Sequence, residues 1–182
     1  MRRYFWDYVL LFSVAGISIT LDQWSKAIVK GQLAFGETWM PLEWLAPYAR
    51  FVHWKNTGAA FGLGQNLNWV FAILACFVIV AIIYYYPEFA TQGLYVRITL
   101  GLMLGGATGN LIDRVLQGHV TDFISVGTFP VFNIADSSIS VGVAVLIVGM
   151  LWHEWRQSRH PADGVTETAI GEEIRAQEAP HE

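Results

Sequence analysis

Four carboxylates are the side chains in or near the apolar part of this 182-residue chain that are best suited to catalysis. Asp22, Asp113, Asp122 and Asp136 stand in or beside apolar stretches. Two carboxylates held close together do not both ionise readily, so one pKa rises and the pair shares a proton. The ionised member can take a proton from an attacking water, while the protonated member donates to a carbonyl oxygen and later to the leaving amine. Two such groups could therefore hydrolyse a peptide bond.

These carboxylates belong to a set of four polar clusters that interrupt the apolar pattern. The clusters are Asp22-Gln23-Trp24-Ser25-Lys26, Asn56-Thr57-Gly58-Ala59-Ala60-Phe61, Gly105-Gly106-Ala107-Thr108-Gly109-Asn110-Leu111-Ile112-Asp113-Arg114, and Asp122-Phe123 followed by Phe132-Asn133-Ile134-Ala135-Asp136. In two places an asparagine precedes an aspartate by three residues, at Asn110 and at Asn133. Residues three apart share a helix face, so each pair can point at one cavity.

Other catalytic chemistries find less support in the sequence. The histidines have no metal-site spacing and there is no HExxH motif, so neither a metal site nor a cofactor is expected. Ser137 and Ser138 have no histidine nearby in sequence to activate them. The single Cys76 lies in an apolar run and has no cysteine partner.

The composition points to lipid as the solvent of the elements that carry these clusters. Hydrophobic residues make up 54% of the chain and charged residues 14%, against about 25% charged in a typical soluble domain. Four apolar segments, at about residues 8–29, 67–86, 97–114 and 134–153, are predicted to be membrane spans. Within the third, Gly101, Gly105 and Gly109 recur every four residues and predict a smooth face for close helix packing. The expected fold is an all-α membrane protein with four transmembrane helices.

Four spans that alternate in direction bring all four polar clusters to one face of the membrane. Arg2, Arg3 and Arg97, with Arg156 and Arg159 after the last span, favour cytoplasmic termini. Lys30, Arg50, Lys55 and Arg114 then fall on the opposite side, so the charge bias is weak. We expect both termini in the cytoplasm and an active site near the outer face.

The segments outside the spans suggest a cap and a tail. The segment 31–66 holds several aromatic residues, and the alternation in Ala49-Arg50-Phe51-Val52-His53-Trp54 is partly typical of a strand. We expect a small cap with some β structure on the outer surface, within a peptidase domain of residues 1–156. Residues 157–182 are polar and acidic and predict a disordered tail. No basic stripe for nucleic acid is present.

Structural and functional alternatives remain open at this point. Asp22 and Lys26, four residues apart, can form a structural ion pair, and Asp113 can pair with a neighbouring cation. The asparagines can serve as hydrogen-bonding links between helices, and Asp122 can be a solvated loop residue. Intramembrane carboxylates also mark proton-coupled transporters or channel subunits, although polar residues gathered at one face disfavour a pathway across the membrane. A scaffold that assembles through the glycine face would leave the carboxylates unexplained.

The polar clusters taken together resemble those of bacterial lipoprotein signal peptidases (signal peptidase II). The matching segments occur in the family's order between about residues 5 and 155, with four spans between them. They are Asp22 to Lys26, Asn56 to Phe61, Gly105 to Arg114, Val120-Thr121-Asp122-Phe123 and Phe132 to Asp136. A single segment of this kind would be weak evidence, whereas the ordered set is highly specific.

This resemblance implies an aspartic endopeptidase of the bacterial cytoplasmic (inner) membrane. Members of the family remove the signal peptide from prolipoproteins that already carry diacylglycerol, and they cut immediately before the lipidated Cys. The family's catalytic pair corresponds to Asp122 and Asp136. Its other polar residues, expected to position the substrate or support the site, correspond to Asp22, Lys26, Asn56, Asn110, Asp113, Arg114 and Asn133. The implied partners are the diacylated prolipoprotein and membrane lipid, and globomycin is an expected inhibitor.

Two features depart from the family pattern. The loop between Asp122 and Asp136 is shorter than in some relatives, and the acidic tail is not a family signature. Asp113 is a rival partner for Asp136 because it lies only nine residues before Asp122. Asp122 is the preferred partner, since Asp113 adjoins the Arg114 cation and is expected to stay charged.

Overall fold

The computed structural model describes residues 2–58 and 64–159 and consists of helices with one small sheet. Four α-helices, α1 (Arg2–Gln32), α2 (Asn68–Phe89), α3 (Leu94–Gln117) and α4 (Ile134–Arg159), make up most of the chain. Three strands, β1 (Thr38–Trp39), β2 (Ala49–Asn56) and β3 (Val120–Val126), and two short 3₁₀ segments, η1 (Glu43–Leu45) and η3 (Ala90–Gln92), complete it. Of the expected disordered tail, residues 157–159 belong to the end of α4 and the rest lies outside the described residues.

Two helical stretches are long and apolar enough to cross a membrane, namely Asn68–Gln92 and Ile134–Arg156. Their outer surfaces are strongly apolar: Phe77 on α2 and Val148 on α4 leave 70% and 64% of their surface exposed. A large exposed apolar surface on a long helix is typical of contact with lipid, in which every backbone polar group must be bonded within the helix. The helices α1 and α3 carry charged residues near their ends, which lowers their hydropathy.

Helix α2 continues past Pro87 to Phe89, three residues beyond the predicted end of the second span at about residue 86. A proline lacks the N–H that would bond to the carbonyl four residues earlier, here that of Ile83. The Tyr8 hydroxyl of α1 donates to this Ile83 carbonyl at 3.2 Å. Because the freed carbonyl has a partner on a neighbouring helix, the proline does not terminate α2.

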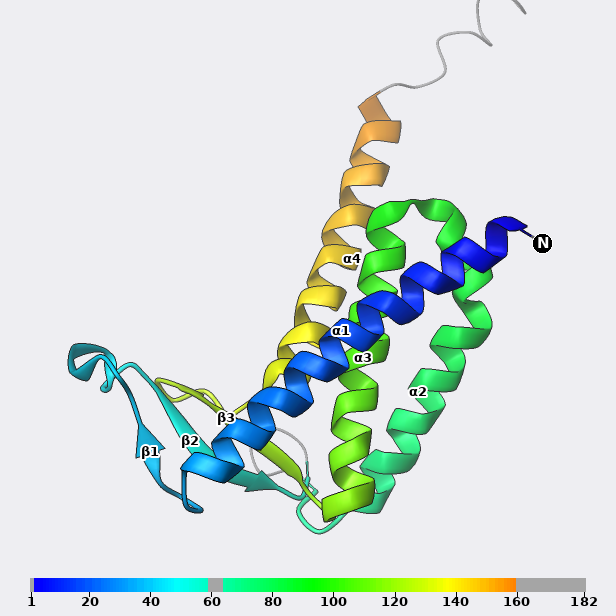
Figure 1. Cartoon of the computed structure of the whole chain (residues 1–182). Helices are drawn as coiled ribbons and strands as arrows, with labels where there is room; N and C mark the ends of the chain where they lie inside the picture. The colour runs from blue at the N-terminus through cyan, green and yellow to red at the C-terminus, as the bar shows by residue number, and fades with distance from the viewer. Residues whose placement is uncertain (1, 59–63, 160–182) are drawn as a thin grey trace, which may run out of the picture. The chain divides into compact units, whose positions relative to one another are not determined.

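The helix α3 packs against α1, α2 and the first part of α4 by means of small residues (Figure 1). A Cβ atom on Gly105 would lie 2.6 Å from the Ser18 Cβ of α1, and one on Gly106 would collide with the Ala135 carbonyl of α4. The α3 backbone therefore approaches both neighbours more closely than any side chain would permit. A core of buried residues that includes Leu11, Tyr86 and Val96 fills the other end of these helices.

The three strands form one antiparallel sheet in the order β1-β2-β3 (Figure 1). The register pairs Trp54 with Asp122 and Asn56 with Val120, and an irregularity separates Phe51 from Trp54. Strand β2 agrees with the alternation noted in the sequence. Strand β3 was not anticipated, because its partner lies more than sixty residues away along the chain, and only tertiary pairing identifies it.

Compact packing of the chain extends to Leu146, and the remainder of α4 forms a separate unit. In that remainder, the rings of Trp152 and Trp155 lie 5.4 Å apart, and the Arg156 guanidinium lies over the Trp152 ring. Indole rings at a helix end are typical of a membrane–water boundary.

Candidate functional site

Asp122 lies on β3, in the part of the sheet where β2 and β3 pair. Its side chain is almost fully buried, with 1% of the residue exposed. The Asn56 amide of β2 donates to one carboxylate oxygen at 3.0 Å, and the Asn133 amide donates to the other at 2.7 Å. The sheet therefore holds the carboxylate between two amide donors, so Asp122 is not the solvated loop residue that was one sequence alternative.

Asp136 lies in the first turn of α4, where local sequence chemistry holds it. The Asn133 side-chain oxygen accepts the Asp136 N–H at 3.0 Å, and the Asp136 carboxylate accepts the Asn133 N–H at 3.2 Å. This reciprocal arrangement is a capping box, which satisfies free N–H groups at a helix start. The three-residue spacing thus predicted a shared location, and the cap also aims the Asp136 side chain.

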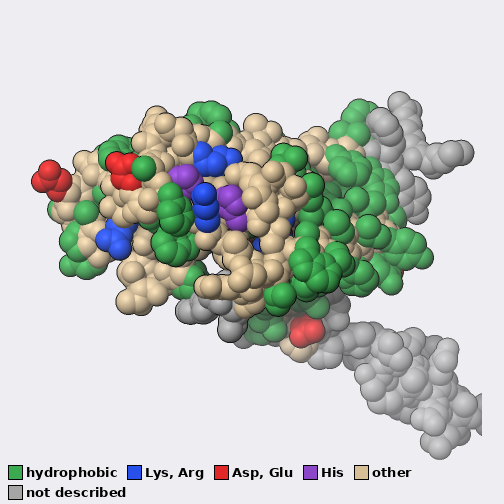
Figure 2. Space-filling model, turned by 90° about the horizontal axis from the view of Figure 1, so that it is seen from below, with side chains coloured by type: hydrophobic (Ala, Val, Ile, Leu, Met, Phe, Trp, Pro, Cys, Tyr) green, Lys and Arg blue, Asp and Glu red, His purple; other side chains and the backbone are tan. Residues whose placement is uncertain are grey.

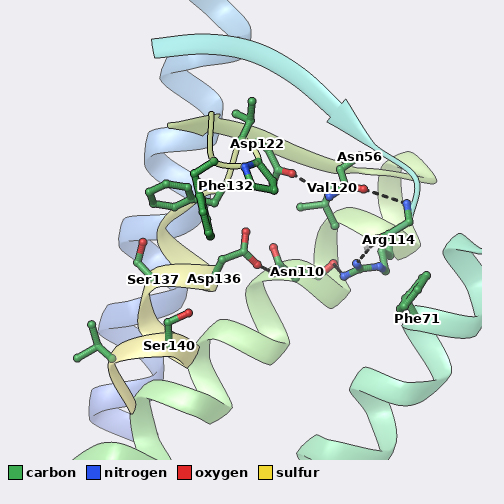
Figure 3. Close-up of a pocket in the computed structure, with 15 residues that line it drawn as sticks. Asn56, Phe71, Asn110, Arg114, Val120, Asp122, Phe132, Asp136, Ser137 and Ser140 are labelled. Atoms are coloured by element: carbon green, nitrogen blue, oxygen red, sulfur yellow. Dashed lines mark hydrogen bonds between the residues drawn. The ribbon is translucent and has the colours of Figure 1, made fainter. Parts of the chain in front are cut away.

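Two amide side chains, those of Asn110 and Asn133, connect the carboxylates of Asp122 and Asp136. Figure 3 shows Asn110 beside Asp136, with Asp122 on the strand above them. Asn110 of α3 donates to an Asp136 oxygen at 2.7 Å. Asn133 donates both to Asp122 and to the Asn110 side-chain oxygen, the latter at 3.1 Å. Groups from β3, α3 and the start of α4 therefore form one hydrogen-bonded chain between the two acids.

A buried ion cluster lies behind this chain, on the side of α1. The Lys26 ammonium contacts the Asp22 carboxylate at 2.8 Å and the Asp113 carboxylate at 3.1 Å, and all three side chains are fully buried. Asp22 also accepts the Ala135 N–H at 2.9 Å, and Asp113 accepts the Thr121 N–H at 3.0 Å. The cluster thereby joins α1 and α3 to the backbone of both segments that carry the paired acids.

The ion cluster also orients the amide of Asn110. An ammonium can only donate hydrogen bonds, and Lys26 donates to the Asn110 side-chain oxygen at 3.0 Å. The Asn110 nitrogen must therefore face the other way, toward Asp136. The buried Lys26 therefore orients Asn110 so that its amide nitrogen donates to Asp136.

A cavity of about 630 Å³ opens beside the paired acids. Asp122 and Asp136 line it together with Arg114, whose guanidinium lies over the Phe71 ring and donates to the Gly58 carbonyl at 3.3 Å. Much of the remaining wall is apolar or hydroxylic, formed by Phe71, Val120, Phe129, Pro130, Val131, Phe132, Ser137, Ser140 and Val141. Such a wall suits an apolar peptide segment with the acids at its polar end.

The environment of Asp122 favours its neutral form. Burial, and then the nearby Asp136 carboxylate, raise the pKa of Asp122 from its ordinary 3.8 to about 7. The hydrogen bonds from Asn56 and Asn133, and the charge of Lys26, act in the opposite direction because they favour the ionised form. Asp122 therefore carries a proton over a pH range in which an ordinary aspartate is ionised.

The structure brings all nine site residues predicted from the sequence into two connected groups. Five of them line the cavity: Asn56, Asn110, Arg114, Asp122 and Asp136. Asp22, Lys26 and Asp113 form the ion cluster behind it, and Asn133 links the two groups. Asp113 faces Lys26, so its role as a rival partner for Asp136 has no support in the geometry.

Sequence reasoning missed two kinds of residue. Gln23 donates to Asp22, to Asp113 and to the Gly109 carbonyl, at 3.1, 3.2 and 3.1 Å. Its position inside the first polar cluster was a usable signal. The aromatic wall residues Phe71 and Phe129 had no signal, because nothing distinguishes them from other apolar residues of their segments. In the part of the chain that the structure describes, no group of three or more His, Cys, Asp and Glu could hold a metal ion.

A helical protein with apolar membrane-type helices and two amide-linked carboxylates at a largely apolar cavity has the features of a membrane-embedded hydrolase. Comparisons with known proteins agree. Residues 14–152 match the family described as Signal peptidase (SPase) II. Lipoprotein signal peptidases of Shouchella clausii and Bacillus subtilis are 41% and 37% identical over 143 and 147 residues, covering 78% and 79% of this chain and 93% and 94% of theirs.

Solved structures give the same result. A bacterial membrane enzyme determined at 2.3 Å by the in meso method superposes with a TM-score of 0.74 at 29% identity, covering 84% of this chain and 92% of that one. A second bacterial membrane enzyme, at 1.9 Å, superposes with a TM-score of 0.70 at 31% identity, covering 78% and 92%. The chain belongs to the signal peptidase II family and is a membrane peptidase of lipoprotein processing.

Proposed function

We propose that this protein is an aspartic endopeptidase that removes the signal peptide from diacylglyceryl-modified prolipoproteins, cutting before the lipidated Cys. One observation carries the mechanism: a buried carboxylate, Asp122, and a half-buried one, Asp136, come from separate elements, line one cavity and are joined through Asn110 and Asn133. The substrate assignment rests on family membership.

In the proposed reaction, Asp122 holds the proton and Asp136 is the base. Asp136 takes a proton from water as the water oxygen attacks the scissile carbonyl carbon. Asp122 donates its proton to the carbonyl oxygen, which gives a neutral tetrahedral gem-diol. The intermediate then collapses: Asp136 gives its proton to the leaving nitrogen, Asp122 takes a proton back from a gem-diol hydroxyl, and the C–N bond breaks. The products are the carboxylic acid and the amine, and the pair again holds one proton, on Asp122.

The surrounding residues have distinct proposed roles. Arg114 lies beside the acids with its guanidinium bonded only to backbone carbonyls, at 3.3 and 3.4 Å, among the described residues, so it can receive a substrate carbonyl. Asn56, Asn110 and Asn133 fix the carboxylate orientations, and Asp22, Lys26 and Asp113 anchor the segments beneath them. The apolar wall would hold the signal peptide side chains.

For the membrane arrangement, we infer that α1 to α4 all cross the bacterial cytoplasmic membrane. The hydropathy of α1 and α3 is low because their ends carry polar residues. These polar ends are buried at the site, so they would not contact lipid in a spanning helix. Both termini are then cytoplasmic and the site, with the small sheet as its cap, lies near the outer face. The peptidase domain is residues 1–156. By resemblance, globomycin is expected to inhibit it.

The test is cleavage of a diacylated prolipoprotein by the purified chain and by Asp122→Asn and Asp136→Asn. Each variant is expected to lose activity by about 10³-fold or more, because it removes a group that transfers a proton in the transition state. Ser13→Ala, a substitution on the lipid-facing part of α1, is the control for mutation as such. Full activity in either Asp→Asn variant, with its thermal unfolding unchanged, would exclude the paired-acid mechanism.

The same assay tests the substrate. The protein should cut the diacylated precursor and leave the same precursor without lipid on its Cys intact. Equal cleavage of both forms would show that the lipid is not part of the recognised substrate, whatever the outcome for the two aspartates.

A further inference from the structure

Basic side chains gather at the end of the helices that carries the sheet. Lys30 at the end of α1 and Lys55 on β2 are exposed, whereas His53, also on β2, is buried and His119, just before β3, is half-buried. We call these four residues the basic row. Figure 2 shows lysine or arginine and histidine side chains side by side in the middle of this face, with hydrophobic side chains around them.

Hydrogen bonds and ring contacts connect the members of the basic row. The Lys30 ammonium donates to the Gln117 side chain at 3.2 Å, and the His119 ring is bonded to the Gln117 carbonyl at 2.9 Å. Lys55 pairs with Thr121 in the sheet, so His119 is its diagonal neighbour on the same face. The Lys55 ammonium and the His53 ring both contact Phe35.

The two lysines of this row are not neutralised. In residues 2–58 and 64–159, the lysine and arginine side chains in ion pairs with carboxylates are those of Lys26 and Arg97. Glu37, an acid of the adjoining loop, accepts the Ala34 N–H at 2.7 Å. Membrane proteins usually carry their excess of lysine and arginine on the cytoplasmic side. In the proposed orientation, the basic row lies on the outer side, so its position calls for an explanation.

Exposed apolar side chains lie near the basic row on both helices. On α1, Trp24 and Ile28 expose 64% and 38% of their surface, six and two residues before Lys30. On α3, Val115 and Leu116 expose 69% and 76% immediately before Gln117. A lipid whose acyl chains lie along these surfaces would bring its headgroup to the level of the lysines.

We propose that the basic row binds the phosphate of an anionic phospholipid, with the acyl chains lying on the exposed ends of α1 and α3. A phosphodiester supplies the negative charge that the row lacks. The two lysines carry six N–H donors, of which Lys30 uses one on Gln117. A soluble acidic protein would satisfy the charge but would have no use for the apolar surfaces beneath. This site is independent of the peptidase reaction, because none of its residues lines the cavity at the acids.

The test measures lipid binding to the full-length protein in neutral detergent by native mass spectrometry. Phosphatidylglycerol and phosphatidylcholine with identical acyl chains are titrated against the wild type, Lys30→Gln/Lys55→Gln and Arg50→Gln. Each lysine is expected to contribute about fivefold to phosphatidylglycerol affinity, so the double variant loses about 25-fold. Arg50→Gln, which removes an exposed charge of the sheet outside the row, stays within about twofold.

Each contrary result overturns the proposal in a recognisable way. Equal binding of both lipids would mean that the headgroup charge is not read, and an equal loss in Arg50→Gln would mean a diffuse charge effect. Full competition by water-soluble glycerol phosphate at the affinity of the lipid would mean a soluble-phosphate site. Preferential competition by an acidic peptide would point to a protein partner instead. Thermal unfolding of each variant verifies that the comparison is made on folded protein.

Discussion

The hydrogen bond from Asn56 to Asp122 makes a quantitative prediction about pH. The Asn56 amide donates to the Asp122 carboxylate at 3.0 Å and favours its ionised form. A hydrogen bond to a charged group contributes about 1.5–3 kcal/mol, and one pKa unit corresponds to about 1.4 kcal/mol. Replacing Asn56 with alanine should therefore raise the pKa of Asp122 from about 7 by about one to two units.

The sign of the effect on activity follows from the proposed role of Asp122 as the proton donor. With a pKa of about 7, Asp122 loses its proton as the pH rises through 7, and kcat/KM should fall about tenfold per unit at higher pH. In Asn56→Ala, Asp122 keeps its proton up to a higher pH. The alkaline limb should consequently move upward, to about pH 8–9, even though the maximal rate is lower.

The assay is kcat/KM for a diacylated prolipoprotein peptide between pH 5 and 10, in detergent, since this parameter reports groups of the free enzyme. Asn68→Ala is the matched control, because the Asn68 amide donates to the Arg114 backbone carbonyl and touches neither acid. The alkaline limb of the kcat/KM profile of Asn68→Ala should stay at about pH 7. An Asn56→Ala limb that stays in place or moves to lower pH would refute the assignment of the proton to Asp122.

Three further predictions concern support of the site. Lys26→Met leaves the buried Asp22 and Asp113 carboxylates without their cation and should lower the free energy of unfolding by about 3–5 kcal/mol, measured by thermal or denaturant unfolding in detergent; no change in stability would contradict the buried cluster. Gly105→Ala puts a methyl group 2.6 Å from α1 and should cost about 1–3 kcal/mol, whereas Gly16→Ala, with open space around it, should cost nothing; equal effects would contradict the close approach. Incubation with a metal chelator should leave the cleavage rate unchanged, and a loss restored by added metal would contradict a purely carboxylate mechanism.

The pattern of apolar segments was sufficient to locate the four helices. Their predicted starts and ends lie within about six residues of the observed ones at both ends, because helix length in an apolar stretch is set by local hydrophobicity. Four membrane spans remain a prediction, since two of the helices meet the hydropathy criterion for a span. The continuation of α2 past Pro87 was not predictable, because it depends on the Tyr8 hydroxyl of another helix.

In the candidate site, too, local features were predictable from the sequence and features that depend on other elements were not. Residue types and three-residue spacings identified the acids and their asparagines, since the capping box at Asn133 and Asp136 is a local device written into four consecutive residues. The direction of each amide was not visible from the sequence. It depends on Lys26 reaching Asn110 from a different helix, 84 residues away.

Asp122 shows most clearly where the sequence stops being informative. Its residue type made it one of four candidate acids, but its residue type and neighbours fitted a solvated loop as well. Only the resemblance paired it with Asp136. The antiparallel pairing of β3 with β2 buries its carboxylate, places Asn56 and Asn133 on its two oxygens and brings Asp136 near. Sequence alone thus determined which acids and amides are present, and it located the helices that carry Asn110 and Asp136. The raised pKa that makes one acid a proton donor arises from burial and from charges on other elements, and only the tertiary structure decides those.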